Sequence, residues 1–283
     1  MRKFLFYALS ILLCACGSND DYADKGGGWD NPGDDDAAKE IRVMSYNIKH
    51  CEPYNPGGEQ LAVNVANVAN AIKMADPDLV FLQEVDRFTT RSGKTSDQVA
   101  ELSKLTGLKV SYFGKAQDYQ GGEFGLAILS KYVLTNTKTI ALPRKEIPGE
   151  YVGYSILCQA DVSIDGTKIT IGSVHLGLQQ EIRDMQLPFM QDHFKNITNP
   201  ILICGDFNAT PNNSTIKTWD SYGFVRTNTD SKNFTIPSLP EPTKELDYIT
   251  FRPAEKFEVL NHKVYTGINA SDHLPIMSIV KIK

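Results

Sequence analysis

The sequence predicts an α/β protein in which two β-sheets pack together and helices lie outside them. Short apolar runs of strand length outnumber the stretches with helical spacing, and the two kinds do not alternate as regular βαβ units. With 41% hydrophobic and 22% charged residues, the 283-residue chain has enough apolar material for a core. No linker is evident after residue 40, so we expect one domain from there to the end.

The first residues have the pattern of a bacterial lipoprotein signal. Arg2 and Lys3 precede an apolar run, Phe4–Cys14, which is too short to span a bilayer but fits the core of a signal peptide. Leu13-Cys14-Ala15-Cys16 then resembles a lipobox, in which cleavage before Cys16 leaves this cysteine lipid-modified. An uncleaved membrane anchor and a plain secretory signal are the alternatives.

The segment after the lipobox should be a flexible acidic tether. It contains Gly26-Gly27-Gly28 and many aspartates, with almost no apolar residues. We therefore expect a signal peptide at residues 1–15, a lipidated tether at 16–39 and a catalytic domain at 40–283. Loss of residues 1–15 removes two cations, so the formal charge goes from −5 to −5 − 2 = −7. The expected location is the bacterial cell envelope, on its periplasmic or cell-surface side.

The first half of the domain should contain two helices and five strands. Gln60–Ala75 has apolar residues at helical spacing and ends at Asp76-Pro77-Asp78, whereas Asp97–Leu105 is stopped by Gly107. The strand-like runs are Ile41–Asn47, Leu79–Gln83, Lys109–Phe113, Gly125–Leu129 and Val133–Ile140.

The second half should contain a hairpin, a helix and several further strands. Asp165-Gly166 lies between two strand-like runs and is a strong hairpin signal. Glu181–Ile197 has helical character, in which Pro188 predicts a kink or a late start. The strand-like runs are Tyr154–Val162, Lys168–Val174, Ile201–Cys204, Asp247–Phe251, Phe257–Val264 and Ile276–Ile282.

The run Ile201–Cys204 changes abruptly into a polar segment that reaches Pro211. Gly205 allows the backbone to turn or to approach a ligand closely. Asp206 and Asn208 are two residues apart, so in an extended chain they would point the same way. A carboxylate beside an amide oxygen can orient a water molecule or bind a hard cation. An Asx-rich turn that closes the strand accounts for this segment equally well.

Other strand-like runs also end or begin with polar residues that structure alone does not require. A glutamate after an apolar strand is usually a solvated end, and a lone histidine is usually structural. A recurring edge of carboxylates, amides and histidines is harder to dismiss and indicates a site. Its members are Asn47, Glu84, His175, Asp206, Asn208, Asp247, Asp272 and His273.

These residue types fit one chemistry. Glu84 and Asp272 offer hard oxygen ligands for Mg²⁺ or Mn²⁺, and Asn47 offers a neutral oxygen or a phosphate donor. Asp206 could take a proton from water, and histidines could stabilise a phosphoryl oxyanion or shuttle protons. The sequence has no Gly-x-Ser-x-Gly elbow, no Walker A loop and no His-Glu-x-x-His pair.

Besides the lipidated Cys16, three cysteines remain after the expected cleavage, and we predict that none of them is a nucleophile. Cys51, Cys158 and Cys204 form no complete disulfide framework because their number is odd. The last two lie in apolar runs and are expected in the core.

Five motifs occur in order along the chain, from Ser45-Tyr46-Asn47-Ile48 to Ser271-Asp272-His273-Leu274-Pro275. Between them are Leu82-Gln83-Glu84-Val85-Asp86-Arg87, Ser173-Val174-His175-Leu176 and Gly205–Pro211. Over about residues 41–283 the chain resembles the endonuclease/exonuclease/phosphatase superfamily, which includes DNase I, exonuclease-III-type apurinic endonucleases, neutral sphingomyelinases and inositol polyphosphate 5-phosphatases. The resemblance implies a DNase I-like four-layer α/β sandwich with two mixed sheets. It also implies metal-dependent phosphoester hydrolysis by direct attack of water.

The resemblance assigns metal ligands by matching motif. Glu84 would be the principal ligand, with Asn47 alongside and Asp272 completing the metal side. Whether one or two ions operate is left open.

The resemblance also assigns catalytic residues. Asp206 would activate or position the water, assisted by Asn208. His273 would contact the phosphate and be oriented by Asp247, and His175 would contact the scissile phosphate.

Further motifs, among them Thr90-Arg91-Ser92-Gly93 and Gln120–Gly125, resemble a bacterial branch of the superfamily. That branch is similar to the catalytic domain of a eukaryotic protein involved in GPI-anchor lipid remodelling. The nearby cations could bind a flanking phosphate of the substrate, although solvated surface is an equally good explanation for each. They are Arg87, Arg91, Lys115 and Arg144.

The charge balance bears on the substrate. A net charge of −5 and a pI of about 5.6 argue mildly against a broad nucleic-acid surface, without excluding a local basic groove. We expect a monomeric Mg²⁺- or Mn²⁺-dependent phosphodiesterase or phosphatase for a small or lipid-linked phosphoester. A secreted nuclease and a non-catalytic lipoprotein that binds a phosphorylated ligand are the alternatives.

Overall fold

The computed structural model describes residues 40–228, 230 and 232–283. The expected signal peptide, the lipidated Cys16 and the tether lie outside these residues. The described residues belong to one compact unit, Ala38–Lys283. Within this part of the chain, no helix combines the length and the apolar character that crossing a bilayer requires.

The first sheet has six strands and is covered on its outer face by two helices, α1 (Val65–Ala75) and α2 (Gln98–Thr106). Its central pair is parallel, whereas the other pairs are antiparallel. In spatial order the strands are β11 (Phe257–Val264), β12 (Ile276–Ile282), β1 (Glu40–Asn47), β2 (Leu79–Arg87), β4 (Gly122–Ser130) and β3 (Val110–Tyr119).

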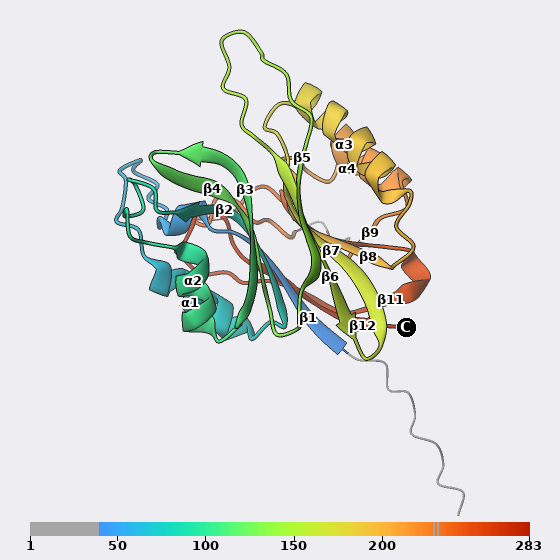
Figure 1. The fold of residues 1–283 in the computed structure, drawn as a ribbon. Coiled ribbons are helices and arrows are strands. Elements are labelled where there is room, and N and C mark those ends of the chain that lie inside the picture. The colour runs from blue at the N-terminus through green and yellow to red at the C-terminus, as the bar shows by residue number, and fades with distance from the viewer. Residues whose placement is uncertain (1–39, 229, 231) are drawn as a thin grey trace, which may run out of the picture. The chain divides into compact units, whose positions relative to one another are not determined.

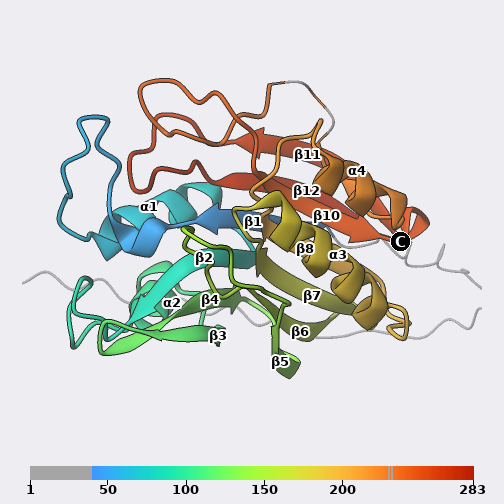
Figure 2. The same cartoon turned by 90° about the horizontal axis from the view of Figure 1, so that it is seen from above.

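The second sheet also has six strands, and α3 (Gln180–Phe194) and α4 (Ser214–Ser221) cover its outer face (Figure 1). In spatial order the strands are β5 (Thr135–Ala141), β6 (Ile156–Ile164), β7 (Thr167–His175), β8 (Ile201–Asp206), β10 (Asp247–Arg252) and β9 (Val225–Arg226). Figure 2 shows the two sheets stacked between the two helix pairs. The predicted sandwich of two packed mixed sheets with outer helices is confirmed.

Side chains alternate between the two faces of each sheet and form three apolar cores. In β1, Val43 packs between the sheets while Met44 faces α1 and α2; in β8, Cys204 packs between the sheets while Ile203 faces α3 and α4. Because successive side chains point to opposite faces and both faces are covered, consecutive residues are apolar in the buried parts of these strands, as in Ile201–Cys204 of β8. This explains why they appear in the sequence as continuous apolar runs.

Several element boundaries differ from the expectation. Helix α1 begins at Val65 rather than at Gln60, because the Asn64 side chain accepts a hydrogen bond from the Asn67 N–H and caps the helix. Helix α3 runs without a late start through Pro188. Its buried side chains, including Leu187 and Met190, provide packing that offsets the hydrogen bond lost at the proline.

Four short elements were not predicted from the sequence, whereas the predicted hairpin is present. Helix α4 has only two buried apolar residues, Ile216 and Trp219, and strand β9 has only two residues in all. The hairpin at Asp165-Gly166 is confirmed, since β6 and β7 pair antiparallel on either side of it. Two short 3₁₀ helices, Lys49–Cys51 and Ala254–Lys256, complete the described structure.

Candidate active site

Three strands of the second sheet bring polar side chains into one row. In the strand register, Asp206 of β8 lies between His175 of β7 and Asp247 of β10. Side chains on neighbouring strands at one register position point to the same face. The row therefore follows from the pairing of the three strands.

Asp206 is almost fully buried, and both of its carboxylate oxygens have defined surroundings. Oδ1 accepts the backbone N–H of Asn208 at 2.8 Å, and Oδ2 accepts the Asn47 amide at 3.1 Å. The Nε2 atoms of His175 and His273 lie 3.5 and 3.6 Å from Oδ2. The segment is thus an Asx turn and also part of a cluster of functional groups, so the two interpretations of its sequence are compatible.

Gly205 precedes this aspartate and allows two strands to lie close together. Its φ is 152°, and a Cβ at this position would collide with the carbonyl oxygen of Val174 on β7. The expected close approach of the backbone is therefore made to a neighbouring strand.

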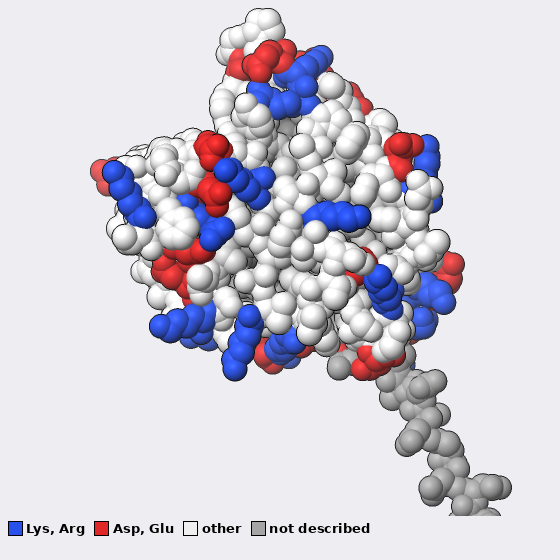
Figure 3. All heavy atoms as spheres, in the orientation of Figure 1, with Lys and Arg blue, Asp and Glu red and all other residues white. Residues whose placement is uncertain are grey.

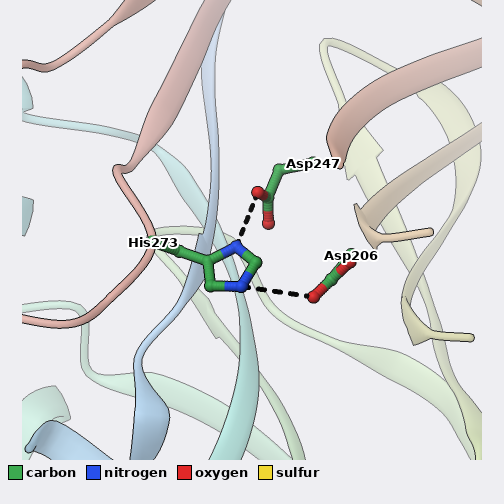
Figure 4. Close-up of side chains that lie close together, drawn as sticks. All are labelled: Asp206, Asp247 and His273. Atoms are coloured by element: carbon green, nitrogen blue, oxygen red, sulfur yellow. Dashed lines mark hydrogen bonds and ion pairs between the residues drawn. The ribbon is translucent and has the colours of Figure 1, made fainter. Parts of the chain in front are cut away.

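His273 lies between two carboxylates (Figure 4). Its Nδ1 is 2.8 Å from Oδ2 of Asp247, and its Nε2 faces Asp206. Burial alone would lower the pKa of His273, but the Asp247 and Asp206 carboxylates outweigh it and raise this pKa to about 10. Burial also raises the pKa of Asp247. We take the pair as an imidazolium that donates to a carboxylate, because His273 has an anionic group on each side.

A serine fixes the loop that carries Asp272 and His273. The Ser271 hydroxyl donates to the Asn47 carbonyl at 2.8 Å and accepts the His273 N–H at 3.2 Å. The Ser238 N–H in turn donates to the carbonyl of Asp272 at 2.7 Å. The loop is thereby tied both to the end of β1 and to the segment before β10.

Glu84 is presented by a β-bulge. The pairing of β2 with β4 shifts between Leu82 and Val85, and Glu84 has a φ of 57°. An extra residue with positive φ redirects a side chain at a sheet edge and is frequent beside active sites. The Glu84 carboxylate accepts the Asn47 amide at 3.0 Å.

The Asn47 side chain is oriented in the structure as a donor to two carboxylates, and its role as a metal ligand stays a prediction. Its Nδ2 donates to both Glu84 and Asp206, while its Oδ1 accepts the Lys49 N–H at 3.1 Å. The amide oxygen is therefore turned away from the carboxylates, and the side chain acts as a donor that holds them in place.

The carboxylates of Glu84 and Asp272 suit a hard divalent cation. Glu84 and Asp272 line the same cavity as Asp206. Burial raises the pKa of Asp272, and the negative charge of Glu84 raises it further. A bound cation would relieve this repulsion, and oxygen donors of this kind fit Mg²⁺ or Mn²⁺. Asp206, Asp247 and His273 also place ligand atoms within 4.8 Å of one another, but the two carboxylates face opposite nitrogens of the imidazole, with a hydrogen bond to Asp247 and an ion pair to Asp206.

The catalytic candidates open into a cavity of about 630 Å³. Asn47 and Asp247 lie behind its wall, with exposures of 0% and 2%. The predicted site residues on the wall are Glu84, Arg91, His175, Asp206, Asn208, Asp272 and His273. The structure thus brings together residues that are up to 189 positions apart in the chain (84 to 273).

Three of the four predicted substrate cations do not line this cavity. Arg87 is 2.8 Å from Asp97, and Lys115 is 2.6 Å from Asp118; both also reach Glu123. Arg144 pairs with Glu146. Carboxylates on neighbouring segments hold these three cations, and Arg144 also lies over the ring of Tyr154, which lines the cavity.

Arg91 does line the cavity, and its guanidinium is fixed. Nε and Nη2 lie 2.7 and 2.9 Å from the two oxygens of Asp86, a fully buried carboxylate. The guanidinium carbon lies 4.6 Å from the centre of the Tyr119 ring and 5.5 Å from that of Phe124. A bidentate pair packed against two rings has little freedom to move.

The aromatic part of the wall could not be predicted from the sequence. Tyr119 and Phe124 are on β3 and β4, whereas Tyr151 and Tyr154 are in the β5–β6 connection, which projects beyond the sheets (Figure 1). Single aromatic residues in strands and loops are most often core or surface. Their convergence depends on tertiary structure.

The chain matches a protein-family model. The model described as "Endonuclease/Exonuclease/phosphatase family" matches residues 44–273. No curated protein matches the chain.

Solved structures share the fold at low sequence identity. An endonuclease/exonuclease/phosphatase from Beutenbergia cavernae DSM 12333 has a TM-score of 0.72 and 21% identity, covering 86% of this chain and 72% of that one. A protein of the same description from Bacteroides vulgatus has a TM-score of 0.69 and 18% identity, covering 87% of this chain and 100% of that one. A mannosyl-6-phosphatase from Bacteroides thetaiotaomicron VPI-5482 has a TM-score of 0.66 and 15% identity, covering 85% of this chain and 99% of that one. These likenesses confirm the DNase I-like sandwich.

Proposed function

Because the chain belongs to the endonuclease/exonuclease/phosphatase family, we propose that it hydrolyses phosphoesters by direct attack of water, with the help of a divalent metal ion. One observation carries the proposal: three carboxylates and two imidazoles converge on one cavity from both sheets. This combination can hold a cation, orient water and stabilise a phosphoryl oxyanion.

Glu84 and Asp272 would hold the ion, which we propose to be Mg²⁺ or Mn²⁺. When bound, it would neutralise the carboxylates and polarise the phosphoryl oxygens. Asn47 would keep Glu84 and Asp206 at a fixed spacing, since its amide donates to both.

Asp206 would position the attacking water and take its proton. One of its oxygens is fixed by the Asn208 N–H, so the carboxylate cannot rotate freely. Asn208 is itself held by a 2.8 Å bond from its amide to the Leu176 carbonyl. A fixed base orients the water without further reorganisation.

The two histidines would face the phosphate. His273, held by Asp247, offers an N–H at Nε2, and His175 offers a second ring on the other side of Asp206. A cationic ring next to the developing negative charge would stabilise the transition state.

We propose that the substrate is a small or lipid-linked phosphoester rather than nucleic acid. On the face shown in Figure 3, Lys and Arg are intermixed with Asp and Glu, and wide areas carry neither. A nuclease is expected to bind flanking phosphates with a continuous basic surface. A mannosyl-6-phosphatase among the structural neighbours is compatible with a small substrate.

Hydrolysis of bis-p-nitrophenyl phosphate and p-nitrophenyl phosphate by the full chain tests the proposal. Activity should require Mg²⁺ or Mn²⁺, disappear on chelation, and fall by about 100-fold or more in Asp206→Asn. Asp192→Asn is the matched control, because this aspartate is exposed on α3 and its carboxylate pairs with Lys195 alone among the described residues. Metal binding without turnover of any phosphoester would favour the non-catalytic alternative, and preferential cleavage of plasmid DNA would favour a nuclease.

We also propose that Cys16 carries a lipid that anchors the protein in the cell envelope. The support is the order of charge, apolar run and small residue before this cysteine. Labelled fatty acid should be incorporated into the wild-type chain in bacteria and not into Cys16→Ser. Equal labelling of both proteins would contradict the assignment.

A further inference from the structure

We propose that the group attached to the scissile phosphate is an uncharged ring bearing hydroxyl groups, either glycosyl or cyclitol. The cavity would bind this ring through its aromatic wall, defined here as Tyr119, Phe124, Tyr151 and Tyr154. The inference rests on the proposed function and narrows its substrate class.

The cavity is much larger than a phosphate requires. Its volume of about 630 Å³ is in the range of pockets that hold organic ligands. Besides the catalytic groups, its wall contains the four aromatic rings, so a bound phosphoester would place its organic part against them.

One ring is best placed to contact that organic part. Tyr119 and Phe124 already pack against Arg91, and Arg144 lies over the Tyr154 ring at 3.9 Å. Tyr151 is 67% exposed and lines the cavity. A single open ring suits the apolar face of a sugar or cyclitol.

The wall also offers many hydrogen-bonding groups. The Tyr151 hydroxyl accepts the Gln117 amide at 3.4 Å, and Ser155 lines the cavity nearby in the sequence. Arg91 uses Nε and Nη2 for Asp86, and its Nη1 has no partner among the described residues. Hydroxyl groups both donate and accept, so a hydroxylated ring can pair with all of these, whereas an acyl chain would leave them unpaired.

Charge argues against a second phosphate. Among the described residues of the cavity wall, Arg91 is the only lysine or arginine, and Asp86 neutralises it. Glu84, Asp206 and Asp272 supply three negative charges to the same wall. A metal ion would offset part of this charge for the scissile phosphate, but any additional phosphate would meet no free cation. The ring should therefore be uncharged.

Phosphate release from five monoesters by the full chain tests the class. Glucose 6-phosphate and myo-inositol 1-phosphate should show a kcat/KM at least about 10-fold above ethyl phosphate, which lacks the ring. They should exceed inositol 1,4,5-trisphosphate and adenosine 5′-monophosphate by a similar factor. Preference for ethyl phosphate, the trisphosphate or the nucleotide would overturn the inference.

Tyr151→Ala tests the ring contact. It should raise KM for the two ring phosphates about 10-fold, leave their kcat nearly unchanged, and affect ethyl phosphate less than about twofold. Val133→Ala is the control, since Val133 is 71% exposed and does not line the cavity. An equal effect of Tyr151→Ala on all three substrates would contradict a ring-binding role.

A binding measurement separates this inference from the proposed function. The five compounds are titrated calorimetrically into Asp206→Asn protein with Mg²⁺, where turnover is not needed. Tighter binding of the two ring phosphates supports the inference even if the wild-type chain hydrolyses none of the five. Equal affinities overturn the inference even if hydrolysis of p-nitrophenyl phosphate confirms the function.

Discussion

The orientation of His273 depends on a single buried carboxylate. Nδ1 of His273 contacts Asp247 at 2.8 Å, which leaves Nε2 to face Asp206. Asp247 is 2% exposed and absent from the cavity wall. It can affect a reacting phosphate only through the histidine, so we regard it as a positioning residue.

Replacement of this carboxylate should lower turnover more than substrate affinity. In Asp247→Asn, the amide can also donate, so it no longer fixes a proton on Nδ1 of His273. We expect kcat for bis-p-nitrophenyl phosphate to fall about 100-fold while KM changes less than about threefold. Asp220→Asn, at an aspartate that pairs with Arg226 away from the cavity, should retain activity. A folded Asp247→Asn protein with unchanged kcat would show that Asp247 does not contribute to turnover.

For single residues, the position along a strand could be predicted from the sequence better than the direction of the side chain. Asn47 was placed correctly at the end of a strand, but the side of its amide that faces the carboxylates depends on the Lys49 N–H. Arg91 could not be separated from Arg87 and Lys115, because all three are cations in similar segments. Only the tertiary structure pairs Arg91 with Asp86 on the cavity wall and the others with carboxylates elsewhere.

At the scale of elements, β8 owes its position beside β7 to a residue without a side chain. Gly205 has a φ of 152° and lies against the Val174 carbonyl. The parallel pairing that it permits puts His175 beside Asp206. A change at this glycine would therefore disturb both the sheet and the site.

Gly205→Ala should be strongly destabilising. The added methyl would collide with backbone that cannot move without breaking the β7–β8 pairing, so we expect a loss of about 3 kcal/mol or more in the free energy of unfolding. Gly166→Ala is the matched control. Gly166 also has a positive φ, of 79°, but nothing lies within 4 Å of the added Cβ, so its loss should be about 1 kcal/mol. Urea titrations of the two variants measure the difference, and equal losses would show that the close approach is unimportant.

Elements with strong periodicity could be predicted from the sequence, and those defined by caps or by tertiary packing could not. Phe257–Val264 and Ile276–Ile282 have the predicted bounds. Helix α4 was missed because its burial depends on Ile216 and Trp219, two apolar residues in an otherwise polar stretch. The start of α1 was misplaced because the Asn64 cap, rather than the apolar spacing, sets it.

At the scale of the whole molecule, the two sheets are joined both at the site and away from it. Near the site, Asn47 bonds Asp206, and Gln83 donates to the Ser173 hydroxyl at 3.0 Å. A second junction involves His262 of β11. Its Nδ1 lies 2.9 Å from the Ser278 hydroxyl of β12 and 3.0 Å from the hydroxyl of Thr227, which follows β9 in the other sheet. Packing of the sheets therefore depends on this histidine as well as on the apolar core.

The His262 junction should make stability depend on pH. Burial lowers the pKa of His262 to about 4, whereas an unfolded chain has the ordinary value of about 6.5. Between these values the unfolded chain binds a proton that the folded chain does not, so stability falls as pH decreases from about 6.5 to 4 and is unaffected above that range. The loss from this one group is up to about 3 kcal/mol. His262→Gln lacks the titration, so urea unfolding at pH 7.5 and at pH 4 should show the wild type losing more stability than the variant by about that amount. Equal losses of stability in the wild type and the variant would show that His262 titrates normally in the folded state.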